Sequence, residues 1–483
     1  MLNESRAPKQ SAHPSRRAFI AGSAAGAGAG LVGSPGTAHA SGGGLDSGED
    51  WPDGPGRANR AQSPDRELRS ILAMIDRRRI EATVRKLVSF GTRHTLSSQD
   101  DPDRGIGAAR DWIFETLQGY AAASGGNMTV EKQAFVQPVS SRVPTPTVIT
   151  NVLATLRGSE EPNRVYLISG HYDSRVSDVM NFTSDAPGAD DDASGVAISM
   201  ELARVMATHR PKATLVFAAV AGEEQGLYGS DHMAKNFKAQ GADVQGMFTN
   251  DIVGSSTADD GTRDVRSIRL FAEGVPTAET PAEAATRVLV GGENDSPARQ
   301  LARFVTEVAD HPVTGQHVRV IYRRDRYLRG GDHISFLQQR YPAARFTEPN
   351  ENFAHQHQDV RVEDGKQYGD LPEFCDFAFI ARNAKVNAAT LWSAANAPGT
   401  PKNATINTSQ LDNNTALSWD ATPGAAGYQV LWRPTIEDDW THIIDVTGTS
   451  TSVNLSKDNV FFGVRSVDDH GRRSPAAFPK PGA

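Results

Sequence analysis

The fold is decided around one acidic segment, Gly188-Ala-Asp-Asp-Asp-Ala-Ser-Gly195. Three consecutive carboxylates repel one another and oppose burial, so the segment is either a solvated loop or a place where divalent cations neutralise the charge. It follows a predicted strand over residues 164–169 and precedes a predicted helix over 195–208. An apolar strand, Ala213–Val220, comes next, and a helix over 226–240 follows it. Unbroken apolar strands that alternate with helices predict an α/β fold, a mostly parallel twisted sheet sandwiched by helices.

Side chains that can bind metal follow the predicted strands at the ends where ligands gather in an open α/β sheet. They are His171, Asp173, Asp191, Glu223, Glu224 and Asp251, with His355 and His357 in a later segment. The set offers carboxylate oxygen and imidazole nitrogen but no thiolate. This donor set suits Zn²⁺, with Co²⁺ or Mn²⁺ as possible substitutes.

The carboxylates would suffice for a two-metal site. A single carboxylate, Asp191, can bridge two ions about 3.5–4 Å apart, as in two-metal hydrolases. Glu224 with one histidine and Asp251 with the other then complete five ligands. Glu223 is left beside the site without a metal, free to accept a proton from water and to pass it to a leaving amine.

The same motifs, in the same order, resemble the di-zinc exopeptidases of family 28 of the metallopeptidases. The motifs are His171-x-Asp173, the acidic segment around Asp191, Glu223-Glu224-x-Gly226, Asn250-Asp251 and His355-x-x-x-Asp359. The resemblance covers roughly residues 66–389 and includes bacterial leucyl aminopeptidases and glutamate carboxypeptidase as relatives. It implies two zinc ions per chain and hydrolysis of peptides by metal-activated water.

The resemblance also implies a role for each residue. His171 and Asp251 would bind one zinc ion, Glu224 and His355 the other, and Asp191 would bridge them. The catalytic residues would be Glu223, as the general base, and Asp173, which would orient His171 through its second ring nitrogen. A cis peptide bond is expected after Asp191.

Two positions are less well determined by the pattern. His355 and His357 would point to one side of an extended segment, and the four-residue step to Asp359 favours His355 as the ligand. Tyr327 is a candidate substrate-binding residue, but its spacing to Asp332 differs by one residue from the aminopeptidases. Phe353 is interpreted as a packing residue.

The two ends of the chain differ from its middle in composition and in sequence pattern. Residues 1–40 carry Arg16-Arg17, an apolar run and a small-residue cleavage pattern, which together predict a twin-arginine export signal. Residues 41–65 have the composition of a linker. The peptidase domain is expected over 66–395. Short alternating strands over 400–480 predict an all-β sandwich that resembles a fibronectin type III domain, with Trp419, Tyr428 and Trp432 in its core.

Composition limits the classes of partner. The 483 residues are 38% hydrophobic and carry 50 Lys and Arg against 58 Asp and Glu, a net charge of −8, which does not favour nucleic acid or anionic lipid. After the export signal no apolar run reaches the ~18 residues of a spanning helix, so no membrane insertion is expected. Cys375 is the only cysteine, which excludes an internal disulfide.

The leading hypothesis is therefore a secreted, periplasmic or extracellular zinc aminopeptidase that acts on peptides. A carboxypeptidase or a single-zinc glutaminyl cyclase-like enzyme is possible on the same fold. A third hypothesis is a non-catalytic binding protein. The sandwich is interpreted as a spacer or as a weak polymer- or surface-binding module.

Overall fold

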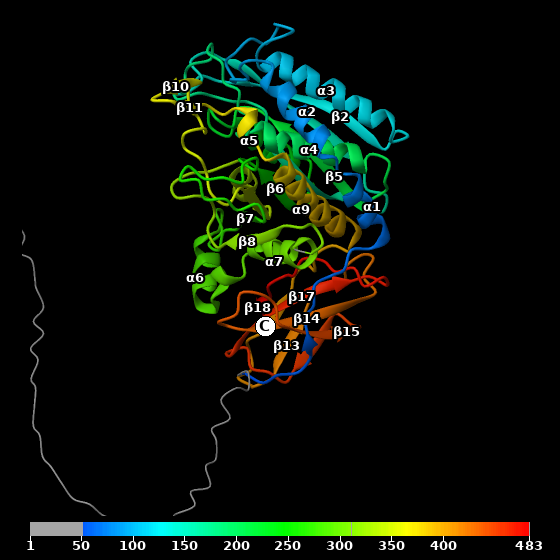
Figure 1. The fold of residues 1–483 in the computed structure, drawn as a ribbon. Coiled ribbons are helices and arrows are strands. Elements are labelled where there is room, and N and C mark those ends of the chain that lie inside the picture. Colours follow the sequence, from blue (N-terminus) through cyan, green and yellow to red (C-terminus); the bar gives the residue numbers. More distant parts are fainter. Residues whose placement is uncertain (1–51, 311, 483) are drawn as a thin grey trace, which may run out of the picture. The chain divides into compact units, whose positions relative to one another are not determined.

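One large mixed sheet forms the centre of the larger domain (Figure 1). The computed structural model describes residues 52–310 and 312–482. Within them, eight strands form this sheet in the order β2-β3-β5-β4-β6-β9-β7-β8. The strands are β2 (Met128–Gln137), β3 (Thr147–Leu156), β4 (Glu161–His171), β5 (Ala213–Val220), β6 (Asp243–Asn250), β7 (Ser267–Phe271), β8 (His317–Ile321) and β9 (Ala343–Thr347).

The sheet is mixed, with a parallel centre. Strands β5, β4, β6 and β9 run parallel to one another, and β7 is parallel to β8. The pairs β2–β3, β3–β5 and β7–β9 are antiparallel. The predicted α/β sheet is therefore confirmed, and its parallel character belongs to the central strands. Every residue of β5 is buried, as expected for a strand covered on both faces.

The crossovers place the sheet's switch point between β4 and β6. Helix α4 (Ala193–Met206) leads from β4 to β5, and α5 (Tyr228–Ala239) leads from β5 back across β4 to β6. Because right-handed crossovers in opposite directions put their helices on opposite faces, α4 and α5 cover different sides of the sheet. Ligand sites of open α/β sheets form at the carboxyl ends of the strands at such a point.

Seven further α-helices lie in the described residues. They are α1 (Arg66–Met74), α2 (Arg77–Val88), α3 (Ile106–Ala122), α6 (Pro281–Val290), α7 (Pro297–Ala309), α8 (His333–Gln338) and α9 (Phe377–Asn396). Helices α2 and α9 pack on α4, whereas α8 packs on α5. In the described residues no helix is long and apolar enough to span a bilayer.

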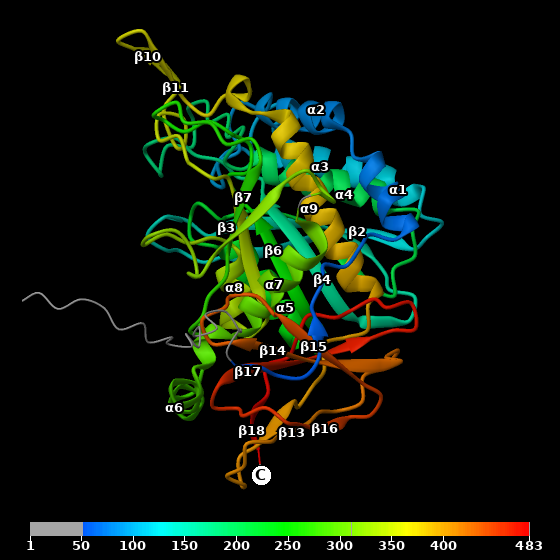
Figure 2. The same ribbon diagram turned by 60° about the horizontal axis from the view of Figure 1, so that its bottom comes forward.

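A β-sandwich follows α9 (Figure 2). Its strands are β12 (Thr405–Asn407), β13 (Thr415–Ser418), β14 (Gly427–Pro434), β15 (His442–Val446), β16 (Ser450–Val453), β17 (Val460–Val467) and β18 (Lys480–Gly482). Together with β1 (Arg57–Ala58) they form two four-stranded sheets, in the orders β1-β15-β14-β17 and β16-β13-β12-β18. Trp419, Tyr428 and Trp432 are buried in one cluster between them, as predicted.

The segment before α1 is not a free linker over its described part. Arg57 and Ala58 pair with Ile443 and His442, so β1 adds an edge strand to the sandwich. The indole of Trp432 donates to the carbonyl of Pro55 at 2.7 Å. The polar, turn-rich composition of this segment predicted a linker. An edge strand of only two residues has no hydrophobic periodicity by which it could be predicted. The predicted export signal and residues 41–51 lie outside the described residues.

Buried charge joins the sandwich to the sheet domain. The carboxylate of Asp295, which precedes α7, lies 2.8 Å from Arg303 of α7 and 2.7 Å from Arg433 of β14. All three side chains are at most 5% exposed. Arg465 of β17 similarly reaches Glu307 of α7 at 2.6 Å. Ion pairs with buried side chains thus fasten the sandwich to the sheet domain.

Candidate metal centre

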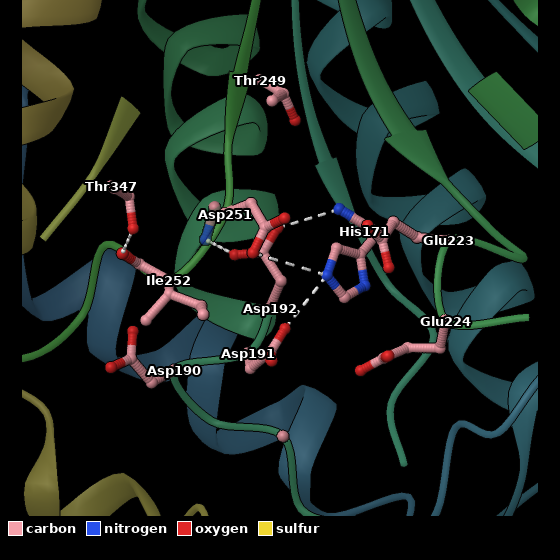
Figure 3. A network of polar contacts seen from close by, with 12 residues as sticks. His171, Asp190, Asp191, Asp192, Glu223, Glu224, Thr249, Asp251, Ile252 and Thr347 are labelled. Atoms are coloured by element: carbon pink, nitrogen blue, oxygen red, sulfur yellow. Dashed lines mark hydrogen bonds and ion pairs between the residues drawn. The ribbon is translucent and has the colours of Figure 1, made fainter. Parts of the chain in front are cut away.

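The acidic segment lies at the switch point between β4 and β6 (Figure 3). His171 ends β4, and Asp251 directly follows β6. Glu223 and Glu224 follow β5, and Asp191 precedes α4. These elements are far apart in sequence but end at one edge of the sheet, where Figure 3 shows their side chains facing a common centre.

Glycine is required where the acidic segment turns into α4. A Cβ on Gly195 would lie 2.3 Å from the carbonyl oxygen of Asn250 and 2.6 Å from the Asp192 carboxylate. The absent side chain lets α4 begin directly against the end of β6. Asp192 then accepts hydrogen bonds from the backbone NH of His171 at 2.9 Å and of Gly195 at 3.0 Å.

The loop that carries Asp191 is also held from outside. Asp370 accepts hydrogen bonds from the backbone NH groups of Asp190 at 2.9 Å and Asp191 at 2.8 Å. The peptide bond between Asp191 and Asp192 is cis, as the resemblance implied. Sequence reasoning missed Asp370, because nothing in its neighbourhood marks a residue 179 positions away as the support of the loop.

His171 and Asp251 form the first half of the centre. The Nε2 atom of His171 lies 3.1 Å from Oδ1 of Asp191 and 3.9 Å from Oδ1 of Asp251. Its Nδ1 faces the carbonyl oxygen of Asp173 at 3.1 Å and the carboxylate of Asp173 at 3.6 Å. Nδ1 is therefore the nitrogen that carries hydrogen in a neutral ring, and Nε2 keeps its lone pair towards the centre.

His357, and not His355, completes the second half. Its Nε2 lies 2.8 Å from Oδ2 of Asp191 and 2.9 Å from Oε1 of Glu224. The three ligand atoms form the second of two groups, in the described residues, with spacing that could hold a metal ion. The first group is His171, Asp191 and Asp251. Asp191 thus presents one oxygen to each half.

His355 lies on the other side of the segment. Its ring stacks on Phe374 with centroids 3.6 Å apart, and burial lowers its pKa to about 4. The prediction of His355 was wrong because it assumed an extended segment. Residues 353–357 form a turn, and His357 has a φ of +56°, so residues two apart do not share a face.

The centre needs more positive charge than its side chains supply, which tests its fit to a metal. Burial lowers the pKa of His171, yet Asp173, Asp191 and Asp251 together hold it well above the usual range. Burial also opposes protonation of His357, but Glu224 and Asp191 raise its pKa to about 10. Oε1 of Glu224 is buried without a hydrogen bond, although Nε2 of His357 is near. Such a cluster fits cations between its ligands.

Arg175 supplies part of that charge at the second half. Its Nε donates to Oε2 of Glu224 at 2.8 Å, and its Nη2 lies 2.5 Å from Nδ1 of His357. Arg175 thus places one guanidinium against both Glu224 and the ring of His357.

Glu223 stands in the same cleft without belonging to either group of ligands. Its backbone NH donates to Oδ1 of Asp173 at 3.3 Å, and that of Glu224 donates to Oδ2 at 3.1 Å. Burial raises the pKa of Glu223 well above its usual range, and Asp251 and Glu224 add to the effect. Asp173 thus orients both His171 and the segment that carries the two glutamates.

The cleft over the centre has a volume of about 640 Å³. Phe353, interpreted from sequence as packing, lines it and is 59% exposed. Tyr327 is 76% exposed and does not line the cleft, and Arg323 lies over its ring. The structure therefore gives Tyr327 no contact with the centre, and its substrate-binding role stays a prediction.

Paired alanine substitutions distinguish the two histidines. His357→Ala removes the sole imidazole of the second half. Loss of an outer-shell partner lowers zinc affinity about 10- to 100-fold, and loss of this ligand should lower the zinc affinity of the second half further. His355→Ala is the matched control and should keep wild-type zinc content. Zinc per chain after dialysis against a metal buffer measures both. Loss of zinc from His355→Ala with retention in His357→Ala would reverse the assignment.

Comparison with known proteins places this arrangement among zinc proteases. The family model described as "Peptidase family M28" matches residues 151–364. A "Probable zinc metalloprotease" of Pyrenophora teres f. teres is 58% identical over 87% of this chain and 88% of its own length. A protein of the same description from Pyricularia oryzae is 55% identical over 88% of this chain and 87% of its own length.

Solved structures with a similar course of the chain are more distant in sequence. LapB from Legionella pneumophila superposes with a TM-score of 0.49 and 17% identity, over 69% of this chain and 77% of its own. The aminopeptidase from Aneurinibacillus sp. strain AM-1 gives a TM-score of 0.47 and 16% identity, over 68% of this chain and 96% of its own.

Proposed function

We propose that this chain, which belongs to peptidase family M28 and is a zinc metalloprotease, is a two-zinc exopeptidase that removes N-terminal residues from peptides. The observation that carries the proposal is the position of Asp191. Its two carboxylate oxygens face the Nε2 atoms of two different histidines, at 3.1 Å and 2.8 Å. A carboxylate shared in this way is what a bridged pair of ions requires.

The roles follow from the two groups. His171 and Asp251 would hold one zinc ion, Glu224 and His357 the other, and Asp191 both. Zinc bound there would supply Lewis-acid chemistry, which polarises the scissile carbonyl and acidifies water. Glu223 would accept a proton from the attacking water and pass it to the leaving amine. Asp173 keeps His171 in the tautomer whose Nε2 is free.

The action on N-termini rests on the resemblance of the motifs to leucyl aminopeptidases, and a substrate panel tests it. Aminoacyl p-nitroanilides should be hydrolysed, lose turnover with a chelator, and regain it when zinc is added back. Cleavage confined to N-acetylated peptides with a free carboxyl end would show a carboxypeptidase instead. Metal content near one ion per chain, with cyclisation of N-terminal glutamine, would show the cyclase-like enzyme. Equal thermal stability with and without chelator, and no turnover, would favour a binding protein.

Export is the second part of the proposal. Paired Arg16 and Arg17 before an apolar run favour a twin-arginine signal removed near Ala40. Substitution of both arginines by lysine should leave the chain inside the producing cell with its full mass. Secretion of that variant would exclude the signal. Binding of a polymer or a surface by the sandwich stays a prediction.

A further inference from the structure

The cleft over the metal centre is unusually rich in arginine. Four arginines line it, together with four carboxylates of the centre. The arginines are Arg142, Arg175, Arg326 and Arg329, and the carboxylates are Asp191, Glu223, Glu224 and Asp251. Two divalent ions carry enough charge to balance all four carboxylates. The loaded cleft would then be cationic unless acids outside it offset the arginines.

Two of the four arginines already have an acidic partner outside the cleft. Arg326 and Arg329 both pair with Glu351, at 3.2 Å and 2.7 Å, and Arg269 shares the same carboxylate at 3.3 Å. Arg326 also reaches Asp325 at 3.2 Å, but Arg345 takes part in that contact at 3.4 Å. Arg326 and Arg329 are therefore already engaged with acids that several guanidinium groups share.

Of the four arginines that line the cleft, Arg142 is the best placed to bind an anionic ligand. Its Nη1 donates to the backbone carbonyl of Glu224 at 2.8 Å, which fixes the guanidinium beside a proposed zinc ligand. Among the residues that the structure describes, no carboxylate forms an ion pair with Arg142. Arg142 is exposed, so the remaining N–H groups of its guanidinium are open to the cleft.

The loop that carries Arg142 is anchored on both sides of it. It joins β2 to β3, and Ser140 and Val143 bridge each other within it. The hydroxyl of Tyr228 donates to Oγ of Ser140 at 2.7 Å, and the side chain of Val143 is fully buried. These contacts hold the loop that carries the guanidinium in place, which reduces the entropy lost when the guanidinium binds an anion.

We propose that Arg142 binds a carboxylate of the peptide substrate, so that the enzyme prefers substrates that carry an anionic group. A guanidinium with a free edge matches a carboxylate in shape and charge. The inference rests on the proposed peptidase function. The carboxylate is either the C-terminal group of a short peptide or an acidic side chain, and the test separates these sources.

The test compares substrates that differ only in one charge. With X the preferred N-terminal residue, X-Ala is compared with X-Ala-amide, and X-Glu-amide with X-Gln-amide. Wild-type enzyme should prefer the carboxylate in one of the two pairs, which identifies its source. In Arg142→Gln that preference in kcat/KM should fall about 10- to 100-fold, mainly through KM, because a charge-assisted hydrogen bond is lost. Arg142→Lys should restore part of it.

Arg157→Gln is the matched control, since Arg157 is an exposed arginine outside the cleft, and it should keep the wild-type preference. A wild-type enzyme that cleaves both members of each pair equally well would overturn the carboxylate site and leave peptide hydrolysis intact. So would a preference that survives in Arg142→Gln. Failure of the zinc-loaded wild type to cleave any of the four peptides would overturn both the site and the proposed function.

Discussion

Replacing Glu223 by glutamine is expected to lower kcat by about 10²- to 10⁴-fold, the usual worth of a general base, while two zinc ions stay bound. Glu223 lines the cleft but contributes no atom to either group of ligands. Glutamine keeps the size of the side chain and removes its ability to accept a proton. Turnover of the best aminoacyl substrate and zinc content of the same sample measure the two effects together.

The neighbouring glutamate provides the contrast. Glu224→Gln removes a ligand of the second group and leaves the base, so zinc affinity should fall along with turnover. The two variants differ by one position in the chain, and only Glu223→Gln should separate activity from metal content. Wild-type kcat in zinc-loaded Glu223→Gln would show that another group takes the proton.

The centre of the fold was predictable because its strands are buried on both faces. Ala213–Val220 is apolar at nearly every position, and β5 begins and ends at those residues. Within the large sheet, β7 and β9, each five residues long, were not predicted. β9, Ala-Ala-Arg-Phe-Thr, is fully buried although it contains an arginine. Arg345 is accommodated because its guanidinium pairs with Asp251 at 2.8 Å, a contact that composition does not reveal.

The site was predictable wherever a ligand follows a strand. His171, Glu224 and Asp251 are positioned by β4, β5 and β6, so strand order and direction bring them together. His357 lies in a turn, where no periodicity relates a residue's number to the direction of its side chain. Arg175 and Asp370 were missed for a related reason, since they act on ligands that are 49 and 179 residues away.

The contact between the two domains could not be predicted from composition either. Asp295 and Arg433 are 138 residues apart, and each alone is an ordinary surface type of residue. The sandwich was interpreted as a spacer, yet its Arg433 is 2% exposed against Asp295. Desolvated ion pairs of this kind cost energy to form, and they hold the geometry in which they are complete.

Replacing Asp295 by alanine is therefore expected to lower the free energy of unfolding by about 3–5 kcal/mol. The substitution leaves Arg303 and Arg433 buried without their shared carboxylate, and it removes the acceptor of Gln300 at 2.8 Å. The cost is that of unpaired buried charge and not of one lost contact. Urea denaturation at neutral pH, followed by circular dichroism, measures the change.

Asp185→Ala is the matched control, because Asp185 also pairs with an arginine of another segment, Arg104, at 2.7 Å. Both of those side chains are more than 40% exposed, so water replaces the lost partner and the change should stay below about 1 kcal/mol. If the two aspartates prove equal, burial at the domain junction adds nothing to the ion pair. If only Asp295→Ala lowers the free energy of unfolding, the sandwich is a structural part of the protease, because its removal would take Arg433 away from Asp295.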